Sequence, residues 1–319
     1  MILVTGAAGF IGYHLCRALL DRGDAVVGLD NLNDYYDVGL KKDRLERLLS
    51  APNFSFHEAD LCDADALDAI ASKAPIRKIC HLAAQVGVRY SLSNPQAYQK
   101  SNLDGFLNII EQARKLEAEN FVYASSSSVY GNNRKIPFST DDRTDEPISF
   151  YAATKRANEL TAHVYSHLYQ LPVTGLRFFT VYGPWGRPDM APFLFTKKIL
   201  AGETIDVYGH GTMKRNFTYV DDIIQGVMLS LDRPQAYKLY NIGNDRTEEL
   251  ERFIAVIEEI TGKKALRNEM DKQPGEMTET WADIEPIQND LGYQPSTDIE
   301  SGMKRFIDWY RDYYNIPAR

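Results

Sequence analysis

The stretch TGAAGFIG, residues 5–12, constrains the fold of this chain more than any other. It follows a short apolar run that is typical of a buried strand, and it precedes apolar residues at helical spacing. The first glycine permits a tight turn, the second lets the backbone approach a diphosphate, and the third allows close packing of helix against strand. The pattern predicts a dinucleotide-binding turn at the N-terminus of a helix. The residues of this predicted turn are Gly6, Gly9, Phe10, Ile11 and Gly12.

An acidic residue ends the second apolar run, AVVGLD, residues 25–30. A carboxylate at Asp30 accepts hydrogen bonds from a ribose diol and repels a 2′-phosphate, so that NAD is favoured over NADP. The alternative is a structural glycine turn followed by a solvent-facing Asp30. The glycines, the strand before them and the acid after them together favour the cofactor.

Short apolar runs alternate with helical patterns along the first half of the chain. The runs expected to be strands are ILVTG (2–6), AVVGLD (25–30), FSFHEAD (54–60), KICHLAA (78–84), NFVYASS (120–126) and PVTGLRF (172–178). This alternation is typical of an α/β protein with a parallel sheet and helices on both faces, the Rossmann doubly wound fold.

The second half of the chain has a different character. TVYGPWGRPDMAP (180–192) is rich in Gly and Pro and is expected to be a loop, whereas LYNIGN (239–244) is expected to return to the sheet. We therefore expect an NAD-binding Rossmann domain and a smaller C-terminal α/β substrate lobe. The expected domain is 1–180 plus about 217–243, and the expected lobe is about 181–216 plus 244–319.

The charge balance excludes some classes of partner. The 319 residues carry 36 Lys and Arg against 44 Asp and Glu, a net charge of −8, and no basic stripe marks a nucleic-acid binder. No apolar run is long enough to cross a bilayer, and no secretion signal is recognised. Cys16, Cys62 and Cys80 form no CxxC pair, so we expect reduced core thiols, no metal site and a cytoplasmic protein.

Tyr151 and Lys155 stand in FYAATKRANE at a spacing that places both side chains on one face of a helix. A nearby ammonium lowers the pKa of a tyrosine. Such a tyrosine removes the proton of a sugar hydroxyl while a hydride leaves the same carbon for a nicotinamide. A YxxxK pair by itself is more often an exposed helix pair. Here it follows a nucleotide turn and Ser126, whose hydroxyl we expect to complete a catalytic set with Tyr151 and Lys155.

These motifs resemble, in order, those of the extended short-chain dehydrogenases/reductases, within the NAD-dependent epimerase/dehydratase family of nucleotide-sugar enzymes. TGAAGFIG, AD before Leu61, HLAA (81–84), SNLDG (101–105), SSVYG, YAATK and RNFTYVDD all match, and the resemblance covers essentially the whole chain. It implies tightly held NAD, a Ser/Thr–Tyr–Lys catalytic set and a homodimer formed through a helical bundle. The cofactor contacts implied beyond the turn are at Asp30, Asn31, Asp60, Leu61, Leu82, Ala83, Ala84, Asn102, Tyr151 and Lys155.

Four serines in a row, at 125–128, stand at the end of the fifth expected strand. Family members that dehydrate or decarboxylate a 4-keto intermediate resemble this chain but carry Asp-Glu or Glu in this segment. Ser127 and Ser128 lack that acid–base power, and their hydroxyls accommodate a substrate carboxylate that Asp or Glu would repel. The alternative is that the serines only fill a polar strand end.

Three further stretches resemble the UDP-glucuronate 4-epimerase subgroup: LDNLNDYYDVGLK (29–41), QVGVRYS (85–91) and the segment 180–190. UDP-galactose 4-epimerases usually carry Asn where Thr180 stands. The resemblance therefore implies a UDP-sugar substrate whose hexuronic carboxylate is bound by Ser127, Ser128 and Thr180, with Arg89 or Arg187 nearby. For Arg187 the alternative is a loop surface charge.

Two positions bear on the diphosphate of such a substrate. Arg215 in MKRNF matches the family arginine that binds it, and the fork of an arginine suits phosphate oxygens. Gln273 falls where related epimerases often carry a second phosphate arginine, and we expect it to contact the substrate.

The sequence thus predicts an isomerase that interconverts UDP-glucuronate and UDP-galacturonate by NAD-dependent C4 epimerisation through a transient 4-keto sugar. Alternatives are a UDP-glucose/UDP-galactose 4-epimerase, and dehydration or decarboxylation on the same scaffold. An alternative from another class is a non-catalytic NAD-sensing regulatory protein. Such a sensor tends to lose the tyrosine or the lysine, and this chain has both.

Overall fold

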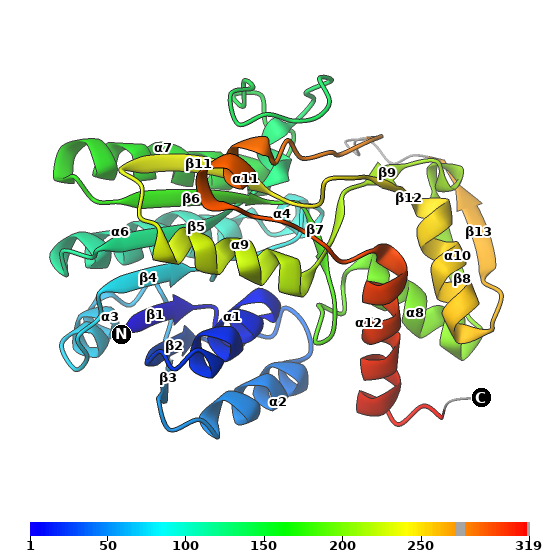
Figure 1. Cartoon of the computed structure of the whole chain (residues 1–319), viewed down its shortest axis with the longest axis horizontal. Coiled ribbons are helices and arrows are strands. Elements are labelled where there is room, and N and C mark those ends of the chain that lie inside the picture. Colours follow the sequence, from blue (N-terminus) through cyan, green and yellow to red (C-terminus); the bar gives the residue numbers. More distant parts are fainter. Residues whose placement is uncertain (272–277, 318–319) are drawn as a thin grey trace.

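The computed structural model describes residues 1–271 and 278–317. Its centre is a parallel sheet of seven strands in the order β11–β6–β5–β4–β1–β2–β3 (Figure 1). The strand order reverses between β1 and β4, as in the predicted Rossmann doubly wound fold, which is thereby confirmed. The strands are β1 (Ile2–Thr5), β2 (Val26–Asp30), β3 (Phe54–Glu58), β4 (Lys78–His81), β5 (Asn120–Ser126), β6 (Val173–Phe178) and β11 (Tyr237–Ile242).

The central strands are apolar on both faces because helices cover both faces. Successive residues of a strand point to opposite sides, and they enter two different clusters: Val4 and Cys80 pack with one, Leu3 and Ile79 with the other. The first cluster is closed by α1 (Phe10–Asp21), α2 (Val38–Leu49) and α9 (Val220–Asp232). The second is closed by α3 (Ala64–Ala71), α6 (Gly105–Lys115) and α7 (Phe150–Tyr169).

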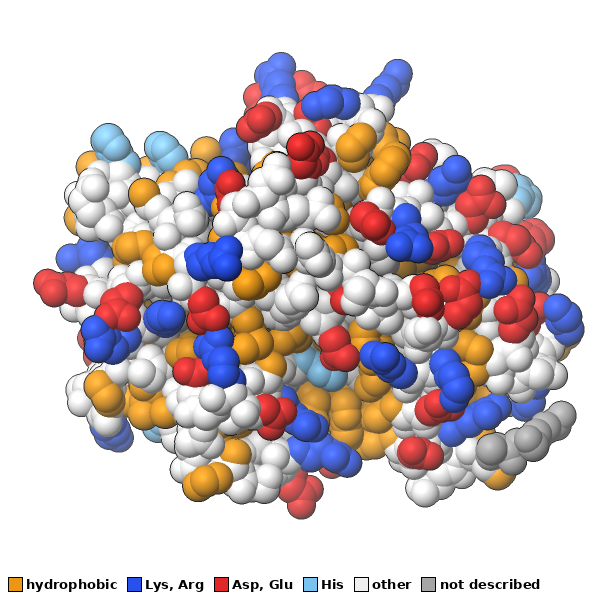
Figure 2. Space-filling model, viewed as in Figure 1, with side chains coloured by type: hydrophobic (Ala, Val, Ile, Leu, Met, Phe, Trp, Pro, Cys, Tyr) orange, Lys and Arg blue, Asp and Glu red, His pale blue; other side chains and the backbone are white. Residues whose placement is uncertain are grey.

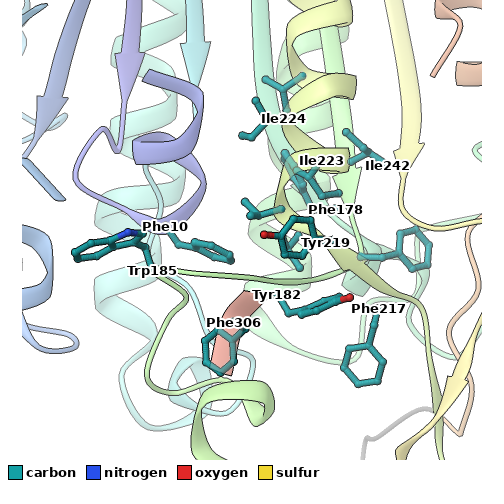
Figure 3. Packing of buried hydrophobic residues seen from close by; sticks show 14 of the residues in the cluster. Phe10, Phe178, Tyr182, Trp185, Phe217, Tyr219, Ile223, Ile224, Ile242 and Phe306 are labelled. Carbon is teal, nitrogen blue, oxygen red and sulfur yellow. The ribbon is translucent and has the colours of Figure 1, made fainter. Parts of the chain in front are cut away.

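A second group of elements lies beside the carboxyl ends of the strands, at the right of Figure 1. Helices α8 (Ala191–Ala201), α10 (Leu250–Thr261) and α12 (Ile299–Tyr313) pack together, and α8 contacts β8 (Thr204–Tyr208), which pairs with β13 (Leu266–Met270). Aromatic side chains fill the space where this second group meets the central sheet. Figure 3 shows Phe178, Tyr182, Phe217 and Phe306 among them, in one buried cluster.

Short elements complete the described chain. The short strands are β7 (Thr180–Tyr182), β9 (Lys214–Arg215), β10 (Phe217–Tyr219) and β12 (Glu248–Glu249). The short helices are α4 (Tyr90–Ser93), α5 (Pro95–Tyr98), α11 (Glu285–Leu291), the π-helix η1 (Gln99–Asp104) and the 3-10 helices η2 (Ser127–Tyr130) and η3 (Gly209–Gly211).

The segment 180–192 is not wholly the loop that its Gly and Pro content predicts. Its first residues form β7, which pairs in parallel with β10, and its last residues begin α8. Val181 and Tyr182 are buried, so that a strand partner distant in sequence overrides the local composition. The loop is therefore shorter than expected and is anchored at both ends.

The surface charges, the cysteines and the helix lengths bear on the expectations about nucleic-acid binding, reduced thiols and membrane crossing. On the face drawn in Figure 2, acidic and basic side chains are interspersed. Cys16 and Cys80 are buried as expected, whereas Cys62 is half-buried because it follows β3 in a surface turn; all three are free thiols. In the described ranges, no helix is long and apolar enough to cross a membrane.

Candidate active site

The glycine turn joins the end of β1 to the start of α1. Gly6 has a φ of +73°, a left-handed conformation that favours glycine. A Cβ atom at Gly12 would lie 2.0 Å from the carbonyl oxygen of Gly6, and one at Gly9 would lie 2.9 Å from the same atom. Gly9 caps α1 without any side-chain hydrogen bond, so the first amides of this helix have no side-chain cap. The turn has the shape and the donors that a diphosphate requires.

Asp30 lies at the end of β2, next to the turn. Its carboxylate accepts hydrogen bonds from the amides of Ala8 at 3.1 Å and Leu32 at 2.9 Å. Burial raises the pKa of Asp30, and the ammonium of Lys41 opposes that effect. A buried carboxylate fixed by two amides in this place suits the ribose diol of NAD.

One cavity of about 460 Å³ runs from the glycine turn past the end of β5. Its volume is in the range of small-molecule and cofactor sites. The predicted cofactor residues that line it are Gly6, Gly9, Phe10, Ile11, Gly12, Asp30, Asn31, Asp60, Leu61, Leu82, Ala83, Ala84, Tyr151 and Lys155. The predicted substrate residues that line it are Ser126, Ser127, Ser128, Tyr151, Thr180, Arg187 and Arg215.

Tyr151 and Lys155 lie one turn apart on α7, whose start is capped by Ser149. Lys155 is buried and its Nζ donates a hydrogen bond to the carbonyl of Ala124 at 2.8 Å. Burial lowers the pKa of Lys155 to about 8, and the carboxylate of Glu159 opposes this. The ammonium is thus held at the end of β5 by backbone geometry.

The pKa of Tyr151 differs from the sequence-based expectation. Burial raises this pKa, and a hydrogen bond with Ser126 and the guanidinium of Arg187 oppose the rise. Lys155 was expected to lower the pKa of Tyr151, but within the protein burial outweighs the neighbouring charges. Ser126, on β5, contacts Tyr151 directly.

The four serines face different partners. The hydroxyl of Ser125 donates to Glu159 at 2.6 Å, away from the other three. Ser126 Oγ accepts hydrogen bonds from both the hydroxyl of Ser128, at 2.9 Å, and its amide, at 3.2 Å. The strand therefore ends in a hydroxyl chain that runs from Ser128 through Ser126 to Tyr151.

A buried charge network lies behind Lys155. Glu159 is fully buried and accepts hydrogen bonds from Arg177 of β6 and from Arg156. The sequence interpretation missed Glu159 and Arg177. The available signal was spacing, because Glu159 follows Lys155 at the interval at which Lys155 follows Tyr151.

Two predicted residues do not line the cavity, and a third lies outside the described residues. The guanidinium of Arg89 packs 5.3 Å from the centre of the Tyr208 ring, and Arg89 is not among the described residues that line the cavity. Asn102 lies behind the cavity wall, where its Oδ1 accepts a hydrogen bond from the amide of Gln85 at 2.8 Å. Gln273 lies outside the described residues.

The cavity also has lining residues that the sequence interpretation did not assign. Those with polar groups or a flexible side chain are Asn33, Tyr35, Tyr36, Lys41, Gln85, Ser101, Ser125, Met190 and Thr280. Several of them belong to the stretch 29–41, which the sequence marked only by its resemblance to a subgroup.

Comparison with known proteins identifies the family. Residues 2–243 match the NAD dependent epimerase/dehydratase family. The chain belongs to this family. The glycine turn, Asp30 and the Tyr151–Lys155 pair all fall within the matched range, so the predicted resemblance is confirmed.

Members of the family with high similarity include bacterial and plant proteins. Protein CapI of Staphylococcus aureus is 49% identical, over 98% of this chain and 99% of that protein. UDP-glucuronate 4-epimerase 3 of Arabidopsis thaliana is 46% identical, over 98% of this chain and 77% of that protein. The crystal structure of UDP-glucuronic acid 4-epimerase from Bacillus cereus, in complex with UDP-glucuronic acid and NAD, has a TM-score of 0.92 at 35% identity and covers 98% of this chain and 99% of that chain.

Proposed function

We propose that this protein is an isomerase that converts UDP-glucuronate to UDP-galacturonate by NAD-dependent epimerisation at C4. The names of the Arabidopsis thaliana and Bacillus cereus relatives support it. The observation in this chain that carries the proposal is a set of neutral hydroxyls, Ser127, Ser128 and Thr180, lining the same cavity as Tyr151. Carboxylic side chains, which dehydration or decarboxylation would use, do not occupy these three positions.

The catalytic set of the proposal is Ser126, Tyr151 and Lys155. The phenolic oxygen of Tyr151 takes the proton of the C4 hydroxyl, which Ser126 holds by a hydrogen bond. The buried ammonium of Lys155 stabilises the tyrosine anion. NAD held by the glycine turn and Asp30 would supply a nicotinamide that can take up a hydride from C4 and give it back. Tyr151 then gives the proton back to the C4 oxygen, so no net acid or base is consumed.

The sugar carboxylate has its own proposed contacts. Ser127 and Thr180 donate hydrogen bonds to it, Ser128 donates when its hydroxyl turns away from Ser126 Oγ, and Arg187 supplies positive charge. A 4-keto uronate is a β-keto acid. It loses CO₂ when the bond between C5 and the carboxylate carbon aligns with the π orbitals of the 4-keto group. Fixed hydroxyl donors hold the carboxylate out of that alignment and protect the intermediate.

The remaining contacts anchor the nucleotide parts. Arg215, which lines the cavity, binds the diphosphate of the UDP-sugar. Gln273, which lies outside the described residues, is proposed as a further contact of the substrate. We further propose that 1–180 plus about 217–243 bind NAD, and that about 181–216 plus 244–319 form the UDP-sugar lobe. The fit of the glycine turn and Asp30 to a dinucleotide supports this division.

We also propose a homodimer located in the cytoplasm. Helices α6 and α7 contact each other and expose Leu107, Leu160, Val164 and Leu168, whose exposed fractions are 47–61%. Contiguous exposed apolar side chains of this kind mark an interaction surface, and a second copy of α6 and α7 would complete a four-helix bundle. Light scattering of the protein and of a Leu160→Glu/Leu168→Glu variant tests this: a dimer that becomes a monomer is expected.

The experiment for the proposed function is an incubation of purified protein with UDP-glucuronate, without added NAD, in D₂O. NMR is expected to show UDP-galacturonate with no deuterium at C4, because the hydride is returned without exchange with solvent. Tyr151→Phe, which keeps the ring and loses the proton-transferring oxygen, is expected to form no product. UDP-pentose, or no conversion by the unmodified protein, would refute the proposal.

A further inference from the structure

Two stretches that are distant in sequence meet beside the cavity. The segment 33–44, which leads into α2, contacts the loop 184–189. The hydroxyl of Tyr35 donates to Asp189 Oδ2 at 3.3 Å, and Nη2 of Arg44 donates to the carbonyl of Trp185 at 2.6 Å. Two of the three stretches that resemble one subgroup are therefore parts of one assembly.

Arg44 is the centre of this assembly. Its side chain is fully buried. Nη1 donates to the carbonyl of Ala8 at 2.9 Å and to the hydroxyl of Tyr36 at 2.8 Å, while Nη2 also reaches the carbonyl of Gly186 at 3.4 Å. Burying a guanidinium is costly unless its donors are satisfied. Both terminal nitrogens of Arg44 have acceptors, whereas its Nε has no partner among the described residues. The planar guanidinium of Arg44 thus joins the nucleotide turn, at the carbonyl of Ala8, to the loop 184–189, at the carbonyl of Trp185.

The loop is held at three successive carbonyls. Nε2 of His14, on α1, lies 2.8 Å from the carbonyl oxygen of Pro184, one residue before the two carbonyls that Arg44 binds. Trp185 has a φ of +62°, a conformation that a non-glycine residue adopts only when its surroundings impose it. Its ring lies 5.6 Å from that of Tyr13 on α1, and Figure 3 shows it beside Phe10, the first residue of that helix. The path of this loop is thus set by α1 and α2.

The next residue after the clamped carbonyls is Arg187. Its side chain lines the cavity and its Nε donates to Asp189 Oδ1 at 3.0 Å. Asp189 is in turn held by Tyr35. Arg187 and Tyr151 line the same cavity, and the guanidinium opposes the rise in the pKa of Tyr151.

We propose that Arg44 is a positioning residue for substrate selection. By fixing the carbonyls of Trp185 and Gly186, it sets where Arg187 enters the cavity, and Arg187 then favours the sugar that carries a carboxylate. This inference rests on the proposed function, because it assumes a hexuronate substrate. Arg44 itself is not among the described residues that line the cavity, so it acts through the loop that it holds.

The test measures binding and needs no turnover. Titration calorimetry gives the dissociation constants of UDP-glucuronate, UDP-glucose and UDP for the unmodified protein, Arg44→Lys and Arg187→Met. Lysine keeps the charge but cannot bind carbonyls as a fork. We expect the preference for UDP-glucuronate over UDP-glucose to fall about tenfold or more in both variants, with UDP affinity unchanged. A preference retained in Arg44→Lys and lost in Arg187→Met would overturn the positioning role.

Two further variants, a control and a milder substitution, distinguish loss of loop positioning by Arg44 from a general loss of folding. Arg47 lies on the same helix and is exposed, and its guanidinium packs 4.7 Å from the centre of the Trp185 ring. Arg47→Lys is expected to keep the preference within about twofold. If Arg44→Lys does not fold, Tyr36→Phe decides, because the Tyr36 hydroxyl fixes the direction of the guanidinium that binds the loop carbonyls. A preference reduced two- to threefold is expected, and an unchanged one overturns the inference.

Failure of the proposed function and failure of the inference about Arg44 give different results. If the unmodified protein binds both sugars equally, no carboxylate selection exists and the inference falls. If it prefers UDP-glucuronate but makes no UDP-galacturonate, the reaction is wrong while the binding series still decides the role of Arg44.

Discussion

Glu159 of α7 and Arg177 of β6 form a buried ion pair with two hydrogen bonds, of 2.8 Å and 2.9 Å. Glu159 lies one helical turn beyond Lys155, and its carboxylate favours the charged form of that lysine. Arg177 also packs 4.9 Å from the centre of the Tyr130 ring. The pair therefore links the sheet to the catalytic helix and sets the charge behind Lys155.

The first prediction concerns the stability of this pair. Glu159→Gln leaves the Arg177 guanidinium buried without its counter-ion, so the free energy of unfolding should fall by about 3–5 kcal/mol. Urea unfolding followed by circular dichroism measures the change. Ser125→Ala, which removes only a hydroxyl donor to Glu159, should cost about 1 kcal/mol. Equal costs for the two variants would contradict a buried ion pair.

The second prediction concerns pH. In the proposed mechanism the active form of Lys155 is the ammonium, and burial lowers its pKa from 10.5 to about 8. Lys155 is charged below this value, so kcat/KM should decline as the pH rises through about 8. Loss of the Glu159 carboxylate lowers the pKa of Lys155 further, so the decline in folded Glu159→Gln should start at a lower pH. Rate profiles from pH 6 to 10 measure this, and identical alkaline limbs would rule out the linkage.

The third prediction concerns the serine run. Ser127→Ala and Ser128→Ala each remove a proposed donor to the sugar carboxylate, a bond of about 1.5–3 kcal/mol. KM for UDP-glucuronate should rise about ten- to a hundredfold, while KM for UDP-glucose changes little. Ser125→Ala is the matched control within the same run, since its hydroxyl faces Glu159. Parallel changes with both sugars would mean that the serines only shape the strand end.

The fourth prediction concerns the glycine turn. Gly12→Ala places a Cβ 2.0 Å from the carbonyl oxygen of Gly6, so the turn must deform, at about 1–3 kcal/mol or more. The purified protein should lose bound NAD, measured by its absorbance after acid release. Gly23→Ala, at a φ of +93° with no atom within 4 Å, is the control: it should cost about 1 kcal/mol and keep NAD. NAD retained by Gly12→Ala would contradict the assigned turn.

Local spacing accounts for the parts that the sequence could predict. The glycines, Asp30 and the Tyr151–Lys155 pair are each fixed by residues a few positions apart, and the alternation of strands and helices fixes the sheet. The ion pair of Glu159 and Arg177 could not be predicted, because it depends on which strand lies beside α7. No local sequence pattern indicates that neighbour.

Long-range partners explain the remaining differences. The strand β7 forms in a segment rich in Gly and Pro only because β10 pairs with it. Arg89 packs on Tyr208, far along the chain, and its direction cannot be read from neighbouring residues. Arg44 joins two loops through carbonyl oxygens, which carry no sequence signature.

The central claim is that the hydroxyls at the end of β5 select a carboxylate, and the ratio of kcat/KM for UDP-glucuronate to that for UDP-glucose tests it most directly. One enzyme preparation should be assayed with both sugars, and products identified by chromatography and NMR. We predict a ratio above about 100 with UDP-galacturonate as the product. A ratio near one, with efficient formation of UDP-galactose, would contradict the claim.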